Sequence, residues 1–138
     1  MAYRSGAPPR IRLGTFSEGS LAPVIFAIVE RGALRRPAAA AQLRAEVELV
    51  TGAEFPPVRI VFGDSAVLVE DGPAVRPDLR VEGSLPDLIS LMVAPLVGGL
   101  PSPVRPRGRA ALGMVALRRV RIQGKLGLMR RVLALIRV

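Results

Sequence analysis

The stretch Asp78-Leu-Arg-Val-Glu-Gly-Ser-Leu-Pro-Asp-Leu-Ile-Ser-Leu91 predicts a short strand, a glycine corner and a helix. Leu79 and Val81 alternate with charged neighbours, which is the period of a strand with one buried face. The glycine allows a sharp turn because it has no Cβ. Ser84 can cap the helix, and Asp87 three residues later suits its first turn, as in a capping box.

The end of the chain repeats this order of strand, glycine and helix. Val120 and Ile122 alternate with Arg and Gln over residues 119–123, and Gly124 separates this strand from a helix expected over Lys125–Val138. Two such units in one chain predict a single sheet whose strands lead into covering helices.

Three further strands are expected earlier in the chain, over residues 44–49, 58–62 and 66–70. The last two flank Gly63-Asp64-Ser65, which has the composition of a hairpin turn. Charges recur on one face of the strands, so the sheet should have one wetted and one covered face. We therefore predict an α+β fold: a five-stranded, largely antiparallel sheet with helices covering one face.

Apolar periodicity predicts a first helix that ends near residues 30–32, and further helices over the ranges 37–43, 85–96 and 108–117. Residues 1–14 are rich in Pro, Gly and Arg, which is typical of a flexible arm. Residues 15–138 are then expected to form a single domain. Its length is sufficient for a real hydrophobic core.

Half of the 138 residues are apolar, but only five are aromatic, and none of these follows Phe62. The second half of the chain must therefore build its core from aliphatic side chains. Such side chains either pack closely or leave a groove that no large ring fills.

The composition argues against an enzyme. The chain has neither histidine nor cysteine, so it lacks thiol nucleophiles and the usual general bases and metal ligands. The carboxylate pairs Glu46/Glu48 and Glu70/Asp71 are equally explained as solvated surface groups. We expect no catalytic residues, no metal and no cofactor. The absence of cysteine also fits a reducing compartment, so we expect a cytoplasmic protein that is peripheral where it meets a membrane.

The charge is divided unevenly along the chain. Residues 1–87 carry a net charge of −1, whereas residues 88–138 contain nine Arg, one Lys and no acid. A basic half suits an anionic partner, although the excess of Arg over Lys is also explained by coding bias. Nucleic acid is the weaker alternative, because the basic half has no aromatic ring to stack on a base. Arg105, Arg107 and Arg109 are the candidates for docking on an anionic membrane.

Residues 78–91, together with the later Val120-Arg-Ile-Gln-Gly and the closing Leu-rich helix, resemble the sterol carrier protein 2 (SCP-2) domain. The Gly63-Asp64-Ser65 turn matches an early hairpin of that family, and the resemblance covers roughly Leu21–Val138. It implies a five-stranded sheet with helices over one face. It also implies a domain that holds a sterol, fatty acyl or polyprenyl lipid in an apolar tunnel without chemistry. One bacterial branch of the family assists ubiquinone biosynthesis.

The surplus of aliphatic side chains favours the same function. We expect an apolar tunnel between the sheet and the helices over 85–96, 108–117 and 125–138. The candidate lining residues are Leu88, Met92, Leu96, Leu112, Val115, Met129, Val132 and Leu133. The alternatives are that these residues form ordinary core, or that the apolar helices bury a homodimer interface in a module that carries no lipid.

Overall fold

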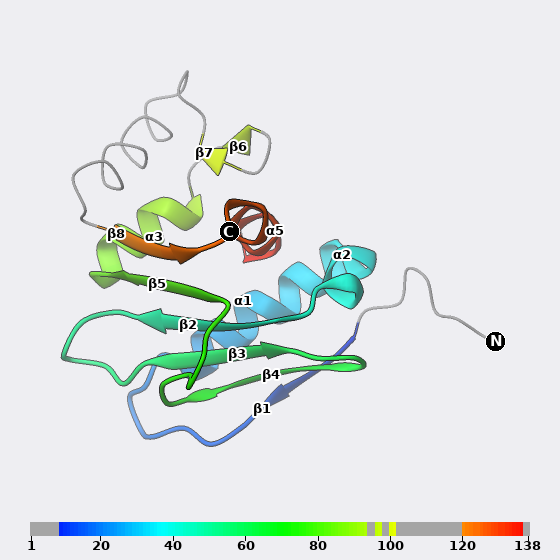
Figure 1. The fold of residues 1–138 in the computed structure, drawn as a ribbon. Coiled ribbons are helices and arrows are strands. Elements are labelled where there is room, and N and C mark those ends of the chain that lie inside the picture. The colour runs from blue at the N-terminus through cyan, green and yellow to red at the C-terminus, as the bar shows by residue number, and fades with distance from the viewer. Residues whose placement is uncertain (1–8, 94–95, 98–99, 102–119, 137–138) are drawn as a thin grey trace.

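The computed structural model describes residues 9–93, 96–97, 100–101 and 120–136. A six-stranded sheet with the strand order β1-β4-β3-β2-β5-β8 forms the centre of the molecule (Figure 1). Its strands are β1 (Arg10–Leu13), β2 (Ala45–Val50), β3 (Val58–Phe62), β4 (Ala66–Asp71), β5 (Leu79–Gly83) and β8 (Val120–Gly124). Two short strands, β6 (Leu96–Val97) and β7 (Leu100–Pro101), pair with each other in a separate two-stranded sheet.

The described helices are α1 (Ala22–Arg35), α2 (Pro37–Gln42), α3 (Leu85–Val93) and α5 (Leu126–Ile136). Each lies close to an expected range, although α1 continues several residues further than its apolar stripe indicated. The helix expected over residues 108–117 lies outside the described residues. Within the part of the chain that the structure describes, no helix is both long and apolar enough to span a membrane.

The α+β class is confirmed, but the prediction of a five-stranded, largely antiparallel sheet is wrong. The sheet is mixed, because β1 pairs in parallel with β4 and β2 pairs in parallel with β5. The sixth strand, β1, comes from residues 10–13, whose composition indicated a flexible arm. Ile11 and Leu13 are partly buried and pack against the hydrophobic core. These contacts help to hold this short strand at the edge of the sheet.

The outer face of the sheet carries a ladder of ion pairs. Arg59 of β3 contacts Glu46 at 3.4 Å and Glu70 at 2.8 Å. Arg80 of β5 likewise contacts Glu48 at 3.3 Å and Glu82 at 2.8 Å. The alternating charges of the sequence therefore lie on one face, as predicted, and the opposite face carries the core.

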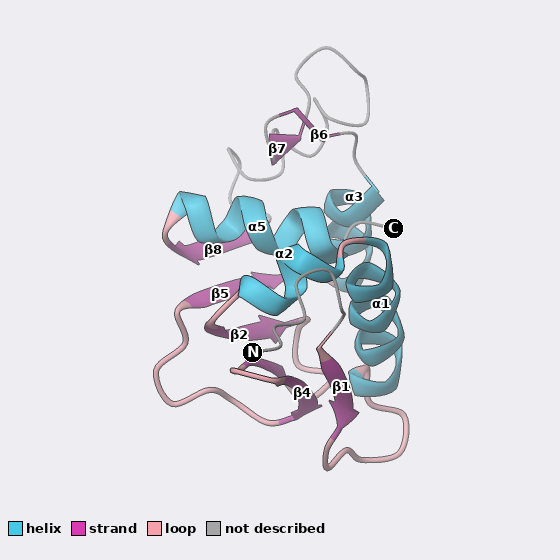
Figure 2. Cartoon of the chain, turned by 90° about the vertical axis from the view of Figure 1, so that its right-hand side faces the viewer, coloured by secondary structure: helices cyan, strands magenta, loops and turns pink. Residues whose placement is uncertain are grey.

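The helices cover that opposite face (Figure 2). The backbones of α1 and α5 are in close contact at Gly32. A Cβ atom at this position would collide with the carbonyl oxygen of Leu135, so only glycine allows the contact. Arg35 strengthens the contact by donating hydrogen bonds to the carbonyl oxygens of Ala134 and Leu135, at 3.1 and 3.2 Å. This crossing fixes α5 over the sheet.

Gly124 connects the last strand to α5. Its φ is 144°, and a Cβ atom there would lie 2.5 Å from the carbonyl oxygen of Asp78. Only glycine accommodates both the backbone angle and this close approach to the neighbouring strand. The turn expected at Gly124 therefore requires glycine because the chain passes so close to the start of β5.

Candidate functional site

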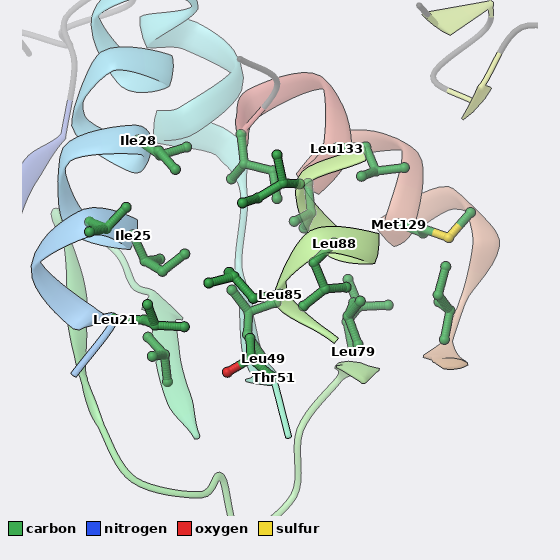
Figure 3. A pocket seen from close by; sticks show the side chains of 17 residues that line it. Leu21, Ile25, Ile28, Leu49, Thr51, Leu79, Leu85, Leu88, Met129 and Leu133 are labelled. Atoms are coloured by element: carbon green, nitrogen blue, oxygen red, sulfur yellow. The ribbon is translucent and has the colours of Figure 1, made fainter. Parts of the chain in front are cut away.

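A cavity of about 210 Å³ lies between the inner face of the sheet and the helices α1, α3 and α5 (Figure 3). The sheet side provides its floor, formed by Leu49, Thr51, Val58, Leu79, Val81 and Ile122. The helix side provides its walls, formed by Leu21, Val24, Ile25, Ile28, Leu85, Leu88, Ile89, Met129, Val132, Leu133 and Ile136.

The periodicity of each element explains why it presents these residues. Side chains on a strand alternate between faces. Leu79 and Val81 of β5 therefore both lie on the inner face, where they form part of the floor, while Arg80 between them lies on the charged outer face. On the helices, neighbours on one face recur three and four residues apart. Val132 and Ile136 of α5 have this spacing, which aligns them along one wall.

The cavity opens to solvent between α1 and α3. Val24 of α1 is 55% exposed and Ile89 of α3 is 48% exposed, although both line the cavity. Leu79 and Val132 line the same space and are buried. The exposed pair therefore marks a mouth, and the buried pair marks the interior.

Thr51 is the one polar side chain among the described lining residues, and it directly follows β2. It is 8% exposed, and its Oγ1 has no hydrogen-bond partner among the described residues. Figure 3 shows it beside Leu49 at one end of the cluster, with Ile28 and Leu133 at the other end. Among the described lining residues, all the others have hydrocarbon side chains apart from the Met129 thioether, so this part of the wall offers apolar contact and no ionisable group.

A second polar feature lies where the chain approaches α1. The Asp71 carboxylate accepts hydrogen bonds from the amide and the hydroxyl of Ser17, at 2.8 and 3.0 Å. Burial acts to raise the pKa of Asp71, but the hydrogen bonds, led by that of the Ser17 amide, outweigh it and lower the pKa. This carboxylate thus holds the segment before α1 against the end of β4.

Four of the residues expected to line a tunnel do line this cavity: Leu88, Met129, Val132 and Leu133. Met92 lies in α3 and Leu96 in β6, but the structure does not describe their side chains. Leu112, Val115, Arg105, Arg107 and Arg109 lie outside the described residues. The roles of all these residues in lipid binding or membrane docking stay predictions.

The sequence interpretation missed the wall formed by α1 and the whole floor. The apolar stripe of α1 was visible, since Leu21, Ile25 and Ile28 have helical spacing. We placed the tunnel beneath the later helices only, because nothing local to that stripe says which helices border a space. The floor residues carried a signal too, as the inner set of each alternating strand.

Comparisons with known proteins bear on the fold. No protein-family model matches the chain, and no curated protein matches it. A solved structure described as "UbiJ-SCP2 Ubiquinone synthesis protein" matches with a TM-score of 0.56 and 15% sequence identity, over 84% of each chain. The chain has the SCP2 fold.

The SCP2 fold is what the motifs of the sequence implied, and that expectation is confirmed. At 15% identity the likeness establishes the fold alone. A second solved structure is a conserved protein from Thermus thermophilus, whose description suggests a sterol carrier protein. It matches over 95% of this chain and 93% of its own, with 12% identity and a TM-score of 0.43, which is too distant to support a conclusion.

Proposed function

We propose that this domain binds an apolar lipid non-covalently and carries or presents it unchanged. The observation that supports the proposal most directly is the cavity, which is lined by aliphatic side chains and opens at the surface between Val24 and Ile89. Such a space offers water few hydrogen-bond partners, so apolar cavities of this kind stay dry or take an apolar guest. Each methylene moved from water into it gains about 0.8 kcal/mol.

The size of the cavity bears on the ligand. An apolar cavity of roughly 150 Å³ is enough to hold benzene, and this one has about 210 Å³. It is smaller than the roughly 300–1,000 Å³ of a typical ligand pocket. A sterol, fatty acyl or polyprenyl chain would therefore be enclosed in part, with the remainder leaving through the mouth. The name of the UbiJ-SCP2 structure makes a polyprenyl lipid one candidate.

The test is native mass spectrometry of freshly purified protein, together with displacement of the fluorescent reporter N-phenyl-1-naphthylamine by unlabelled lipid. Ile25→Trp replaces an aliphatic side chain of the cavity wall with a bulky indole ring. Phe26→Trp introduces the same ring at a partly buried neighbour that does not line the cavity. We expect Ile25→Trp to weaken lipid binding about tenfold or more, an effect of roughly 1.4 kcal/mol. Phe26→Trp should bind as the wild type does.

The alternative is a homodimer that buries the exposed apolar side chains of the helices, among them Val24, Leu34 and Ile89. Light scattering before and after lipid extraction separates the two proposals. A monomer that releases lipid supports the carrier. A dimer that contains no lipid, does not bind the reporter and dissociates on Val24→Glu would contradict it.

A further inference from the structure

The volume of the cavity limits how much of a lipid it can enclose. An apolar cavity of roughly 150 Å³ holds one molecule of benzene, which has six carbon atoms. By the same ratio, the cavity of about 210 Å³ has room for about eight carbon atoms. This is the end of one aliphatic chain, and it is less than a whole sterol, long-chain fatty acid or polyprenyl lipid.

The interior wall of the cavity is formed by α5, and this helix is anchored near both of its ends. The chain enters α5 through Gly124, which lies against the backbone of Asp78, and near the other end the backbone of Leu135 lies against Gly32. Arg35 of α1 adds hydrogen bonds to carbonyl oxygens in the last turn. Closely packed backbones have little freedom to shift, so a longer ligand cannot deepen the cavity by pushing α5 outward.

The opposite side of the cavity is its mouth. Val24 and Ile89 are exposed there, whereas Leu79 and Val132 in the interior are buried. The surface that the described residues present to the cavity is apolar. A polar head group that entered first would therefore lose its hydrogen bonds with water, whereas a head group left at the mouth keeps them.

We propose that the cavity accepts the end of a single aliphatic chain, tail first, to a fixed depth of about eight carbon atoms. In this inference, which rests on the proposed function, the tail enters between α1 and α3 and ends against α5 at Val132. Figure 3 shows Met129 and Leu133 of α5 across the cavity from Leu21 and Ile25 of α1. The rest of the chain and the head group stay outside the mouth.

The first test is a series of chain lengths. Binding of the straight-chain alcohols from 1-pentanol to 1-dodecanol to the full-length protein is measured by isothermal titration calorimetry. Each added carbon should tighten binding about fourfold up to about 1-octanol, because each methylene leaves water for the cavity. Beyond that length the gain should fall below about twofold per carbon, since the added carbons lie outside the mouth. A steady gain through 1-dodecanol would overturn the fixed depth.

Val132→Ala tests whether α5 sets this limit. Val132 is buried and lines the cavity, so the truncation removes wall atoms from the interior. The length at which the gain stops should then become about two carbons longer, to match the two carbons removed. Val29→Ala is the matched control, because Val29 is equally buried but does not line the cavity. An identical limit in the two variants would show that α5 does not set the depth.

Val132→Ile changes the same wall in the opposite direction. It adds one carbon to the interior, so the limit should become about one carbon shorter. This variant keeps the test decisive if Val132→Ala does not fold. A limit that stays at the wild-type length in Val132→Ile would count against the proposed wall.

A diol tests the direction of entry. Whichever end of 1,10-decanediol enters the cavity carries a hydroxyl group into the apolar interior. The diol should therefore bind at least about tenfold more weakly than 1-decanol. Equal binding of the two compounds would overturn tail-first entry.

The outcomes separate this inference from the proposed function. If no alcohol of the series binds the wild type, both fail. If the alcohols bind, but their affinity rises steadily with length and the diol matches 1-decanol, the cavity binds lipid and the fixed depth alone is overturned.

Discussion

The two halves of α1 pack differently: one borders a cavity, and the other is in close contact with α5. The N-terminal half borders the cavity through Val24, Ile25 and Ile28. The C-terminal half meets α5 so closely that Gly32 has no room for a Cβ atom beside Leu135. The inward-facing residues of both halves are aliphatic or small, so the composition of this face does not distinguish the hollow region from the closed one.

The difference follows from what each half meets. At the closed end a glycine brings two backbones together, and Arg35 bonds to the carbonyl groups of α5. At the hollow end α1 faces α3 across a space, and the exposed Val24 and Ile89 mark its opening. A rigid closed end would allow the hollow end to keep its space without collapse. The following variants test whether the closed and the hollow end of α1 differ in this way.

The largest effect is expected from Leu135→Ala. Leu135 is 1% exposed and does not line the cavity, so truncation should cost about 2–5 kcal/mol in the free energy of unfolding. Leu133→Ala, two residues earlier on the same helix, should cost less, because Leu133 already borders empty space. Urea denaturation of both variants measures the difference.

Bound lipid should change the difference in stability between these two variants. Saturation with 1-decanol should increase the cost of Leu133→Ala, since the lipid gains contacts with the intact leucine, and should leave the cost of Leu135→Ala unchanged. Equal costs for the two variants, with and without lipid, would mean that Leu133 is ordinary core.

The sequence predicted most elements of this fold, because their signals are local. The charged and apolar residues of 78–82 alternate within five positions, and Gly124 is the last residue of its strand. It did not predict the pairing of β2 with β5 in parallel, since partner choice depends on contacts between distant residues. Residues 10–13 alternate as well, but four residues in a Pro- and Arg-rich stretch give too short a pattern to separate from a loop.

The candidate site was predictable in part for the same reason. The apolar faces of α3 and α5 are visible in the sequence, and Leu88, Met129, Val132 and Leu133 were chosen from them. Thr51 gave no signal, because a single threonine after a strand is ordinary. The role of Gly32 was not visible in the sequence either, because the backbone that excludes its Cβ lies about a hundred residues further along the chain.

An intermediate effect is expected from Gly32→Ala. The new methyl group would collide with the Leu135 backbone, so α5 would have to move, at a cost of about 1–3 kcal/mol as for other overpacked cores. The better helix propensity of alanine would offset up to about 1 kcal/mol of this. Differential scanning calorimetry should show a net loss of stability.

Gly127→Ala is the matched control for this change. Gly127 also lies in a helix, but its Cβ would meet nothing within 4 Å. The same substitution there should be neutral or stabilising by up to about 1 kcal/mol. If both alanine variants were stabilised equally, the backbone contact between α1 and α5 would not exist in solution.

The smallest effect concerns the hollow end, where Asp71 holds the segment before α1 through Ser17. The pKa of Asp71 is lowered below its usual 3.8 in the folded protein. Its contribution to stability is therefore present above about pH 3.8 and is lost as the pH falls through the folded pKa. Because the bonds are exposed, we expect Asp71→Asn to cost about 1 kcal/mol or less at pH 6.

The wild type and Asp71→Asn should converge in stability as the pH falls below 3.8, because the protonated carboxyl group no longer accepts both bonds as a charged acceptor. Hydrogen exchange at pH 6 tells where the effect acts. Amides of residues 24–28 should exchange faster in Asp71→Asn, while those of residues 32–35 keep their protection, since the contact with α5 holds them. Faster exchange along the whole of α1 would mean that its two halves open as one unit, and that the closed end does not stabilise itself independently.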